Sequence, residues 1–538
     1  MPGHGRWMIG PLSGFRLSAL LFVALVAVYN VDRTAMEEGD AVPNMNLPLA
    51  LIHHGTFSFT PNDYPAMFAW QSRPPLWETE EFYVRSWDSP IGDRPASEWR
   101  KQGDLTLHGP RYHLVRSPTR GVYVDTFGPI PGLTLFPLVW VLDKLDPAFG
   151  TKFELGLAVA KLHASMLVAA SVVLLYWMAR RFASEKGSLA VALTFGLGTC
   201  AWAIASQNLW QQTVSIFFLC AGALPLIRWP ERPLPTALSG LAFGVAIACR
   251  PTSLVLVFAV VVYRALYLRK TLAPFLLGLL PAPLAIGAYN AHFFGSPFTF
   301  AQSVIGHQMA KAKTGSDALW QTPFYVGLAG LLASPSRGLL VFSPVLAFAG
   351  KGIVTIWRDR RYLVLRPLTV GMAWMMFMQC LWFDWWGGWA YGYRPWLDAT
   401  PLLALCLAPV IDDVFRTKWE RVAFAAAFAW SVGVQFVGAF SYDKSWNDRE
   451  IFVVRLPGVR KPFALLNEPE ARSFAKTRHG SYLGPSFCNI DYSYCRSRLW
   501  SVPDSMLIYY VTHFRQTRKE RFHLAWRQLS LFRHAARS

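Results

Sequence analysis

Long runs of apolar residues, separated by short polar loops, follow one another along most of the chain. A helix needs about 20 apolar residues to cross the hydrocarbon core of a bilayer, which is roughly 30 Å thick. Runs of about this length lie near residues 14–31, 154–179, 188–206, 209–228, 234–250, 251–268, 272–294, 337–357, 363–383, 395–414 and 419–440. They predict an all-α integral membrane protein with about 11 transmembrane helices, juxtamembrane helices and a large first external loop.

Composition agrees with a membrane location. Of 538 residues, 53% are hydrophobic and only 16% are charged. A soluble domain cannot bury that much apolar surface, whereas lipid accepts apolar side chains on every face of a helix. The runs divide the chain into an N-terminus with the first span (1–31), an external loop (32–153), a polytopic domain (154–440) and a C-terminal tail (441–538).

Positive charges predict the orientation in the membrane. A formal net charge of +19 could suit nucleic acid, but many Lys and Arg residues cluster in every second loop, as is typical of cytoplasmic loops. The clusters are Arg6/Arg16, Arg180/Arg181/Lys186, Arg228/Arg232, Arg264/Arg269/Lys270, Arg358/Arg360/Arg361 and Arg416/Lys418/Arg421. We therefore expect a cytoplasmic N-terminus, external loops at 32–153, 295–336 and 384–394, an external tail, and no nucleic-acid partner.

Other segments are too short to span a bilayer. Pro129 to Leu145 is interrupted by prolines, and a crossing there would export Arg180 and Arg181, so we predict a re-entrant or interfacial helix. Phe324 to Ala333 is a similar half-length piece. The chain end from residue 513 alternates Phe, Leu and Trp with Arg, which predicts a basic amphipathic helix on anionic lipid.

Two of the seven cysteines differ from the rest. Cys488 and Cys495 lie close together in the polar tail, where an oxidising compartment would allow a local disulfide. The other five lie inside apolar runs, where cysteine is usually a small hydrophobic residue. No zinc-ligand spacing accompanies any of them.

Ionisable groups at the outer membrane boundary are costly, so they are the best indication of a site. Glu37, Glu38 and Asp40 follow the first span. A carboxylate there could act as a general base on an acceptor hydroxyl, or these acids could simply stabilise the start of the next helix. His53 and His54 end that helix, but adjacent helical residues point in different directions, which argues against a metal site.

A second candidate lies in the aromatic segment 381–401, which contains Asp384, Trp386, Tyr393, Arg394 and Asp398. Aromatic rings can stack on sugar faces, and the planar Arg side chain suits phosphate. An interfacial aromatic belt is the alternative, but it explains the Trp residues without explaining Arg394.

Two weaker candidates complete the set. Arg250 separates two apolar runs at the outer face, where it could bind an anion or extend its charge to the interface. In the loop after residue 294, His307, Gln308, Lys311 and Lys313 could hold a phosphate. Motifs for soluble nucleotide chemistry are missing from the sequence, so an activated substrate would have to arrive within the lipid.

Seven segments together resemble, in order, bacterial membrane glycosyltransferases of the C-type superfold, closest to the protein O-mannosyltransferase-like and aminoarabinose transferase-like enzymes. They are GDAVPNMNLPLALIHHGTFSF, GVYVDTFGPIPGLTLFPL, LWQQTVSIFFLCAGAL, GLAFGVAIACRPTSLVLV, GAYNAHFFGSPFTF, LLASPSRGLLVFSPVLAF and WWGGWAYGYRPWLDATPLLAL. The resemblance covers roughly residues 15 to 440.

The resemblance implies an enzyme of the bacterial inner membrane that transfers a sugar from a polyprenyl-phosphate donor to an acceptor at the external, periplasmic face. It implies that Asp40 activates the acceptor and that Arg250 and Arg394 bind the donor phosphate. Sugar or acceptor contacts are expected from the remaining candidates: Glu38, His53, His307, Asp384, Trp386 and Tyr393. Ala41 stands where a second acid often follows in the family, so a divalent metal is not supported.

Two other classes of function stay open. A flippase or transporter for lipid-linked sugar would show internal repeats and midplane charges. A non-catalytic envelope scaffold would tolerate loss of Asp40. The acceptor could be a protein, a lipid or a glycan.

Overall fold

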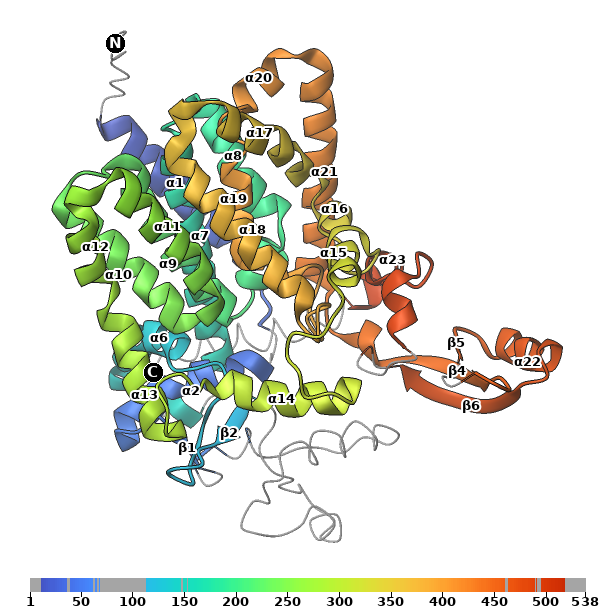
Figure 1. Cartoon of the computed structure of the whole chain (residues 1–538). Coiled ribbons are helices and arrows are strands. Elements are labelled where there is room, and N and C mark those ends of the chain that lie inside the picture. Colours follow the sequence, from blue (N-terminus) through green and yellow to red (C-terminus); the bar gives the residue numbers. More distant parts are fainter. Residues whose placement is uncertain are drawn as a thin grey trace.

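A computed structural model describes residues 11–35, 39–60, 63–64, 67, 113–146, 149–151, 153–459, 463–488, 490 and 495–517. Most of the chain forms a bundle of helices (Figure 1). A small sheet lies at one end of the bundle, and a second sheet with one helix projects sideways from it as an arm. Glu38 and the chain end after residue 517 lie outside the described residues.

Within the described residues, four helices are long and apolar enough to cross a membrane: Leu155–Ala179, Arg269–Phe294, Arg360–Leu381 and Lys418–Ser441. They comprise α7 (Phe153–Ala179), α12 (Leu272–Leu279) with α13 (Pro281–Phe294), α18 (Arg366–Leu381) and α21 (Lys418–Ser441). Shorter apolar helices are α1 (Pro11–Asn30), α10 (Pro233–Cys249), α11 (Leu254–Tyr267) and α15 (Phe324–Ala333). The count of eleven spans stays a prediction.

Several predicted spans are not single helices, because glycine, proline or polar residues interrupt them. Residues 188–206 form α8 (Glu185–Gly198) and a π-helical turn, η5 (Ala201–Ala205). Residues 337–414 outside α18 contain α16 (Leu339–Phe342), η8 (Pro344–Phe348), α17 (Ala349–Arg358), η9 (Arg360–Leu365), η10 (Arg394–Ala399), α19 (Thr400–Leu405) and α20 (Ile411–Arg416). Irregular backbone at membrane depth is tolerated where protein surrounds it, and α19 is buried throughout.

The other helices of the bundle include α9 (Gln211–Arg228), which matches the predicted span 209–228, and helices of the connecting segments and of residues 32–153. They are η1 (Gly39–Ala41), α2 (Val42–His54), α6 (Ile130–Leu145), η4 (Phe149–Thr151), α9, η6 (Pro251–Ser253), η7 (Arg269–Thr271) and α14 (Ala301–Thr314). α6 covers the segment predicted to be re-entrant, and it packs closely on α2, where Gly132 leaves room for Leu47. The membrane depth of α6 stays a prediction.

The prediction of an all-α chain missed two small antiparallel sheets. The first joins β1 (Ser58–Phe59), β3 (Tyr123–Asp125) and β2 (Leu114–Arg116) in that order. The arm joins β5 (Phe463–Leu465), β4 (Arg449–Arg455) and β6 (Ser481–Cys488), with α22 (Glu468–Thr477) packed on one face. These strands are short and lie outside the long apolar runs. The search for membrane-spanning runs therefore could not detect them. η11 (Ser445–Asp448), η12 (Arg496–Trp500) and α23 (Met506–Thr512) connect the arm to the bundle.

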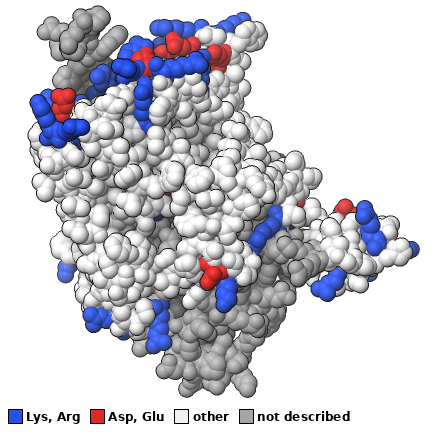
Figure 2. Space-filling view, in the orientation of Figure 1, with Lys and Arg blue, Asp and Glu red and all other residues white. Residues whose placement is uncertain are grey.

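Charge is unevenly distributed over the surface. Lys and Arg gather at the end of the bundle where α17 and α20 lie, and a broad uncharged band separates this basic end from the opposite one (Figures 1 and 2). The basic clusters predicted to be cytoplasmic include Arg358 and Arg416, which are the last residues of α17 and α20. α2, α14 and the first sheet lie at the opposite end.

One cysteine of the tail is oxidised. Cys495 is disulfide-bonded, whereas Cys200, Cys220, Cys249, Cys380 and Cys406 are free. The side chain of Cys488 lies outside what the structure describes. Its pairing with Cys495 therefore stays a prediction.

Close contact between α10 and α12 depends on small residues. A Cβ added at Gly240 would collide with the carbonyl oxygen of Phe275, and one added at Gly278 would collide with that of Ala237. We expect Gly240→Leu to lower the melting temperature, because overpacking costs about 1–3 kcal/mol or more. Gly433→Leu is the control, since a Cβ at Gly433 meets nothing within 4 Å. If Gly240→Leu and Gly433→Leu had the same melting temperature in detergent, this account of the packing would be contradicted.

Candidate functional site

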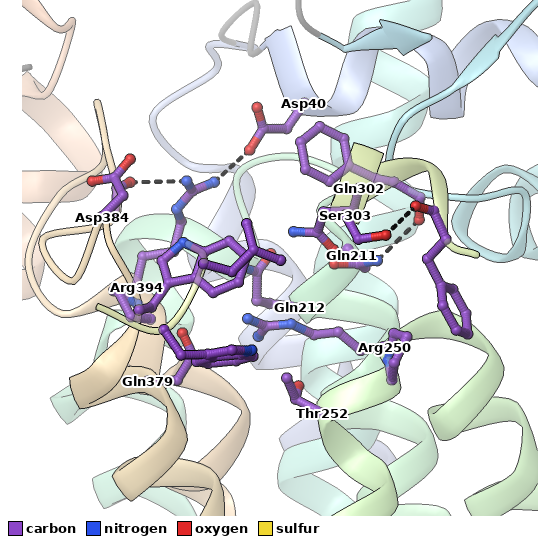
Figure 3. Close-up of a pocket in the computed structure, with 18 residues that line it drawn as sticks. Asp40, Gln211, Gln212, Arg250, Thr252, Gln302, Ser303, Gln379, Asp384 and Arg394 are labelled. Atoms are coloured by element: carbon purple, nitrogen blue, oxygen red, sulfur yellow. Dashed lines mark hydrogen bonds and ion pairs between the residues drawn. The ribbon is translucent and has the colours of Figure 1, made fainter. Parts of the chain in front are cut away.

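The structure contains a cavity of about 320 Å³ (Figure 3). Its lining includes residues of α14, which lies at the end of the bundle opposite the basic end (Figure 1). Segments far apart in the sequence line the cavity: η1, the turn after β3, the start of α9, η6, α14, and the end of α18 with the loop that follows. Asp40, Arg250, Asp384 and Arg394 are among the lining residues. The structure thus brings four candidate residues from three separate sequence segments to one place.

Asp40 and Arg394 form an ion pair at the edge of this cavity. Arg394 Nη1 lies 2.6 Å from Asp40 Oδ2, and its Nη2 donates to the carbonyl oxygen of Gly387 at 2.8 Å. The guanidinium also lies over the Trp210 ring, 4.6 Å from its centroid. Both ionic side chains are largely buried yet keep 11–16% exposure, so solvent or a ligand can still reach them.

Local structure holds Asp40 in place. Pro43 lies in the first turn of α2, where its missing N–H costs nothing, and α2 begins directly after η1. Asn44 Nδ2 donates to the carbonyl oxygens of Asp40 at 3.3 Å and of Leu209 at 2.9 Å. These bonds tie η1 to the segment before α9, which also carries Trp210.

Arg250 lies at the C-terminal end of α10, where Pro251 begins η6. Its Nη1 contacts Asp398 Oδ2 in η10, and both side chains are less than 10% exposed. Arg250 still lines the cavity (Figure 3). A buried ion pair fixes geometry, since removing one partner leaves the other charge uncompensated.

The loop between α18 and η10 forms one wall of the cavity. Gly387, Gly388 and Gly392 have φ of 74°, 63° and 62°, a backbone conformation that other residues adopt only with strain. Asp384 in this loop accepts from Lys313 Nζ of α14 at 2.9 Å. The loop therefore turns sharply while ion pairs and backbone bonds hold it against its neighbours.

Residues outside the cavity support this loop from behind. Arg337 is fully buried and donates to the carbonyl oxygens of Trp386 at 2.9 Å and Gly388 at 3.0 Å. Arg496 lies over the Trp386 ring at 4.5 Å and donates to the Lys313 carbonyl oxygen. The C-terminal tail is thus part of the structure that shapes the cavity.

Several sequence candidates do not line the cavity. Trp386 and Tyr393 belong to the loop but are buried in the protein, and the Tyr393 hydroxyl contacts Ser343 Oγ at 2.6 Å. His307 is exposed on α14, with its ring Nδ1 2.7 Å from the Asp317 carbonyl oxygen. His53 pairs with Asp143 of α6 at 2.9 Å. These four side chains lie outside the cavity lining, and their predicted sugar or acceptor contacts stay predictions.

Asp125 is a cavity neighbour that the sequence argument overlooked. It ends β3, and its Oδ1 accepts from the backbone N–H of Phe127, a lining residue, at 2.8 Å. Burial raises the pKa of the Asp125 carboxyl well above its usual range, and the nearby charge of Asp40 adds to this effect. Its place in the run GVYVDTFG, among apolar residues, was the available signal.

The described residues contain no group of three or more His, Cys, Asp or Glu side chains that could hold a metal ion. Glu37 and Glu38 lie outside the described residues. The described lining side chains provide two carboxylates, two guanidinium groups, several amides and hydroxyls, and aromatic rings. Such a set can bind a phosphate and a polyhydroxylated ligand and can accept a proton.

No protein-family model and no curated protein matches the sequence. Among solved structures, the chain is similar to the archaeal oligosaccharyltransferase AglB from Archaeoglobus fulgidus in complex with an inhibitory peptide and a dolichol-phosphate, at 12% identity and a TM-score of 0.41. A second match is the Archaeoglobus fulgidus oligosaccharyltransferase tethered to an acceptor peptide, at 13% identity and a TM-score of 0.40. The matches cover 79% and 80% of this chain and 55% of each solved chain, so this chain spans about half their length.

Proposed function

We propose that this protein is a membrane glycosyltransferase that moves a sugar from a polyprenyl-phosphate donor to an acceptor at the external face of a bacterial inner membrane. The observation that carries the proposal is the meeting of Asp40, Arg250 and Arg394 in one cavity. These residues come from three distant parts of the chain, and each had been singled out from the sequence. Their cavity lies away from the basic end, which supports an external site.

The proposed reaction is an inverting displacement at the anomeric carbon of the donor sugar. An acceptor hydroxyl oxygen forms the new bond to this carbon, and the bond from the carbon to the phosphate oxygen breaks. Asp40 takes the proton from the acceptor hydroxyl. Arg394 and Arg250 stabilise the negative charge that develops on the departing lipid phosphate.

The ion pairs within the cavity suit this division of roles. Arg394 uses Nη1 for Asp40 and Nη2 for the Gly387 carbonyl oxygen, so its guanidinium is oriented before any ligand binds. Arg250 is oriented in the same way by Asp398. Preorganised charges need little rearrangement during the reaction, which is the condition under which they lower a barrier most.

The test uses the full chain in liposomes with polyprenyl phosphate carrying a radiolabelled sugar, and a cell-envelope fraction as the source of acceptor. We expect acceptor-dependent loss of the labelled donor and release of free polyprenyl phosphate. Donor that crosses the bilayer without cleavage would identify a transporter instead. Donor that neither reacts nor moves would contradict both functions and favour a scaffold.

A further inference from the structure

Uncharged polar side chains also line the cavity, and some of them lie next to Arg250. Gln212 at the start of α9, Thr252 in η6, Gln302 in α14 and Gln379 near the end of α18 all line the cavity (Figure 3). Four separate elements supply these side chains. The tertiary fold therefore brings them together. In a polar loop, by contrast, polar residues would be close only because they are neighbours in the sequence.

These four side chains make no hydrogen bond to any other part of the chain that the structure describes. Thr252 Oγ1 is buried without a partner among those residues. Gln211 provides a comparison, because its Nε2 donates to the carbonyl oxygens of Phe127 at 2.9 Å and Cys249 at 2.6 Å. The NH2 group of Gln211 thus has two acceptors within the protein, whereas the amide of Gln212 is left for a ligand or water.

The charged groups of the cavity, in contrast, are already matched within the protein. Asp40 pairs with Arg394, Arg250 with Asp398, and Asp384 with Lys313. These three pairs carry no net charge, and they present both signs near the cavity. Every donor of the proposed class brings a phosphate to Arg250 and Arg394. A further charge on the sugar would have to compete with Asp40, Asp398 or Lys313 for a partner that is already in an ion pair.

We infer that Gln212, Thr252, Gln302 and Gln379 form a subsite for the hydroxyl groups of one uncharged monosaccharide. This inference rests on the proposed function and names the sugar class of the donor. Amide and hydroxyl side chains both donate and accept, which matches sugar hydroxyls. A volume of about 320 Å³ is at the low end for ligand pockets and suits one phosphorylated sugar.

The edge of the subsite carries aromatic rings. Trp320 and Trp382 both line the cavity and meet edge to face, with centroids 4.9 Å apart. Aromatic surface next to amides is suited to a sugar, which has apolar C–H faces and polar edges. The specificity would come from the amides, since polar groups that a wrong ligand leaves unpaired cost free energy.

The test compares three donors on the full-length protein in liposomes: polyprenyl phosphate carrying glucose, 4-amino-4-deoxyarabinose or glucuronic acid. We expect kcat/KM for the glucosyl donor to exceed the other two by about 10²-fold or more, as is usual for sites that hydrogen-bond their substrate. Preferred transfer of either charged sugar would overturn the inference and leave the proposed function intact. Absence of transfer from every donor would overturn the proposed function and the inference with it.

A substitution tests the residues themselves. Gln302→Glu keeps the side-chain shape and adds a carboxylate, so we expect kcat/KM to fall for the glucosyl donor and the relative use of the amino-sugar donor to rise at least tenfold. Gln308→Glu is the matched control, because Gln308 is on the same helix but does not line the cavity. An unchanged donor ratio in Gln302→Glu, with melting as in wild type, would overturn the subsite.

Discussion

Asp40→Asn is expected to reduce glycosyl transfer by about 10²–10⁴-fold, the usual contribution of a general base. The amide keeps the size of the side chain but cannot take the proton of the acceptor hydroxyl. The contact with Arg394 loses its ionic character in the same variant, which weakens the orientation of that guanidinium. The measurement is kcat/KM for the labelled donor, with membrane insertion and melting temperature recorded alongside.

Asp143→Asn is the matched control for this substitution. Asp143 is also buried and also has a basic partner, His53 at 2.9 Å, but neither residue lines the cavity. We expect near-normal transfer from this control. Normal turnover by Asp40→Asn would remove Asp40 from the proposed mechanism, and equal losses in both variants would point to a general effect of disturbing buried carboxylates.

Arg394→Ala is expected to lower kcat by about 10²-fold or more, the range seen when a charge-stabilising donor is removed from a reaction site. Arg394→Lys should recover only part of this loss. A lysine can carry the charge, but its single ammonium group cannot contact Asp40 and Gly387 together while lying flat over Trp210. Steady-state kinetics with the labelled donor would separate kcat from KM.

Arg366→Ala controls for the loss of an arginine in general. Arg366 likewise lies over a tryptophan ring, Trp357 at 5.5 Å, and donates to backbone carbonyl oxygens, but it begins α18, close to α17 and outside the cavity. The double variant Asp40→Asn/Arg394→Ala gives a further check. If the two side chains act as one unit, its loss will be smaller than the product of the single losses. Independent losses would contradict a coupled pair.

Sequence reasoning predicted the class of structure better than its details. The apolar runs indicated membrane helices, and the four helices long and apolar enough to cross a membrane, among the described residues, overlap them. The hydrophobic pattern could not show that residues 337–357 and 395–414 break into short helices, because buried irregular backbone has the same composition as a span. The sheet in the first loop and the arm were missed because their strands are short and alternate weakly.

For the candidate site, the sequence predicted charged residues better than their neighbours. Asp40, Arg250, Asp384 and Arg394 stood out because charge is rare at outer membrane depth, and all four line the cavity. Trp386, His53 and His307 were chosen by residue type alone, and their side chains lie elsewhere. Asp125 could have been noticed as an acid among apolar residues, but the glutamines that line the cavity gave no local signal, since only tertiary packing brings them there.

The support that Arg496 gives to the cavity loop has a consequence for the order in which the site is built. All of the cavity-lining residues lie before residue 396, whereas Arg496 follows the whole arm in the sequence. In a nascent chain, the lining residues are therefore synthesised before the residue that braces Trp386 and Lys313. This brace can form only after the arm has been synthesised, so the final shape of the cavity loop depends on a segment that is made after the lining.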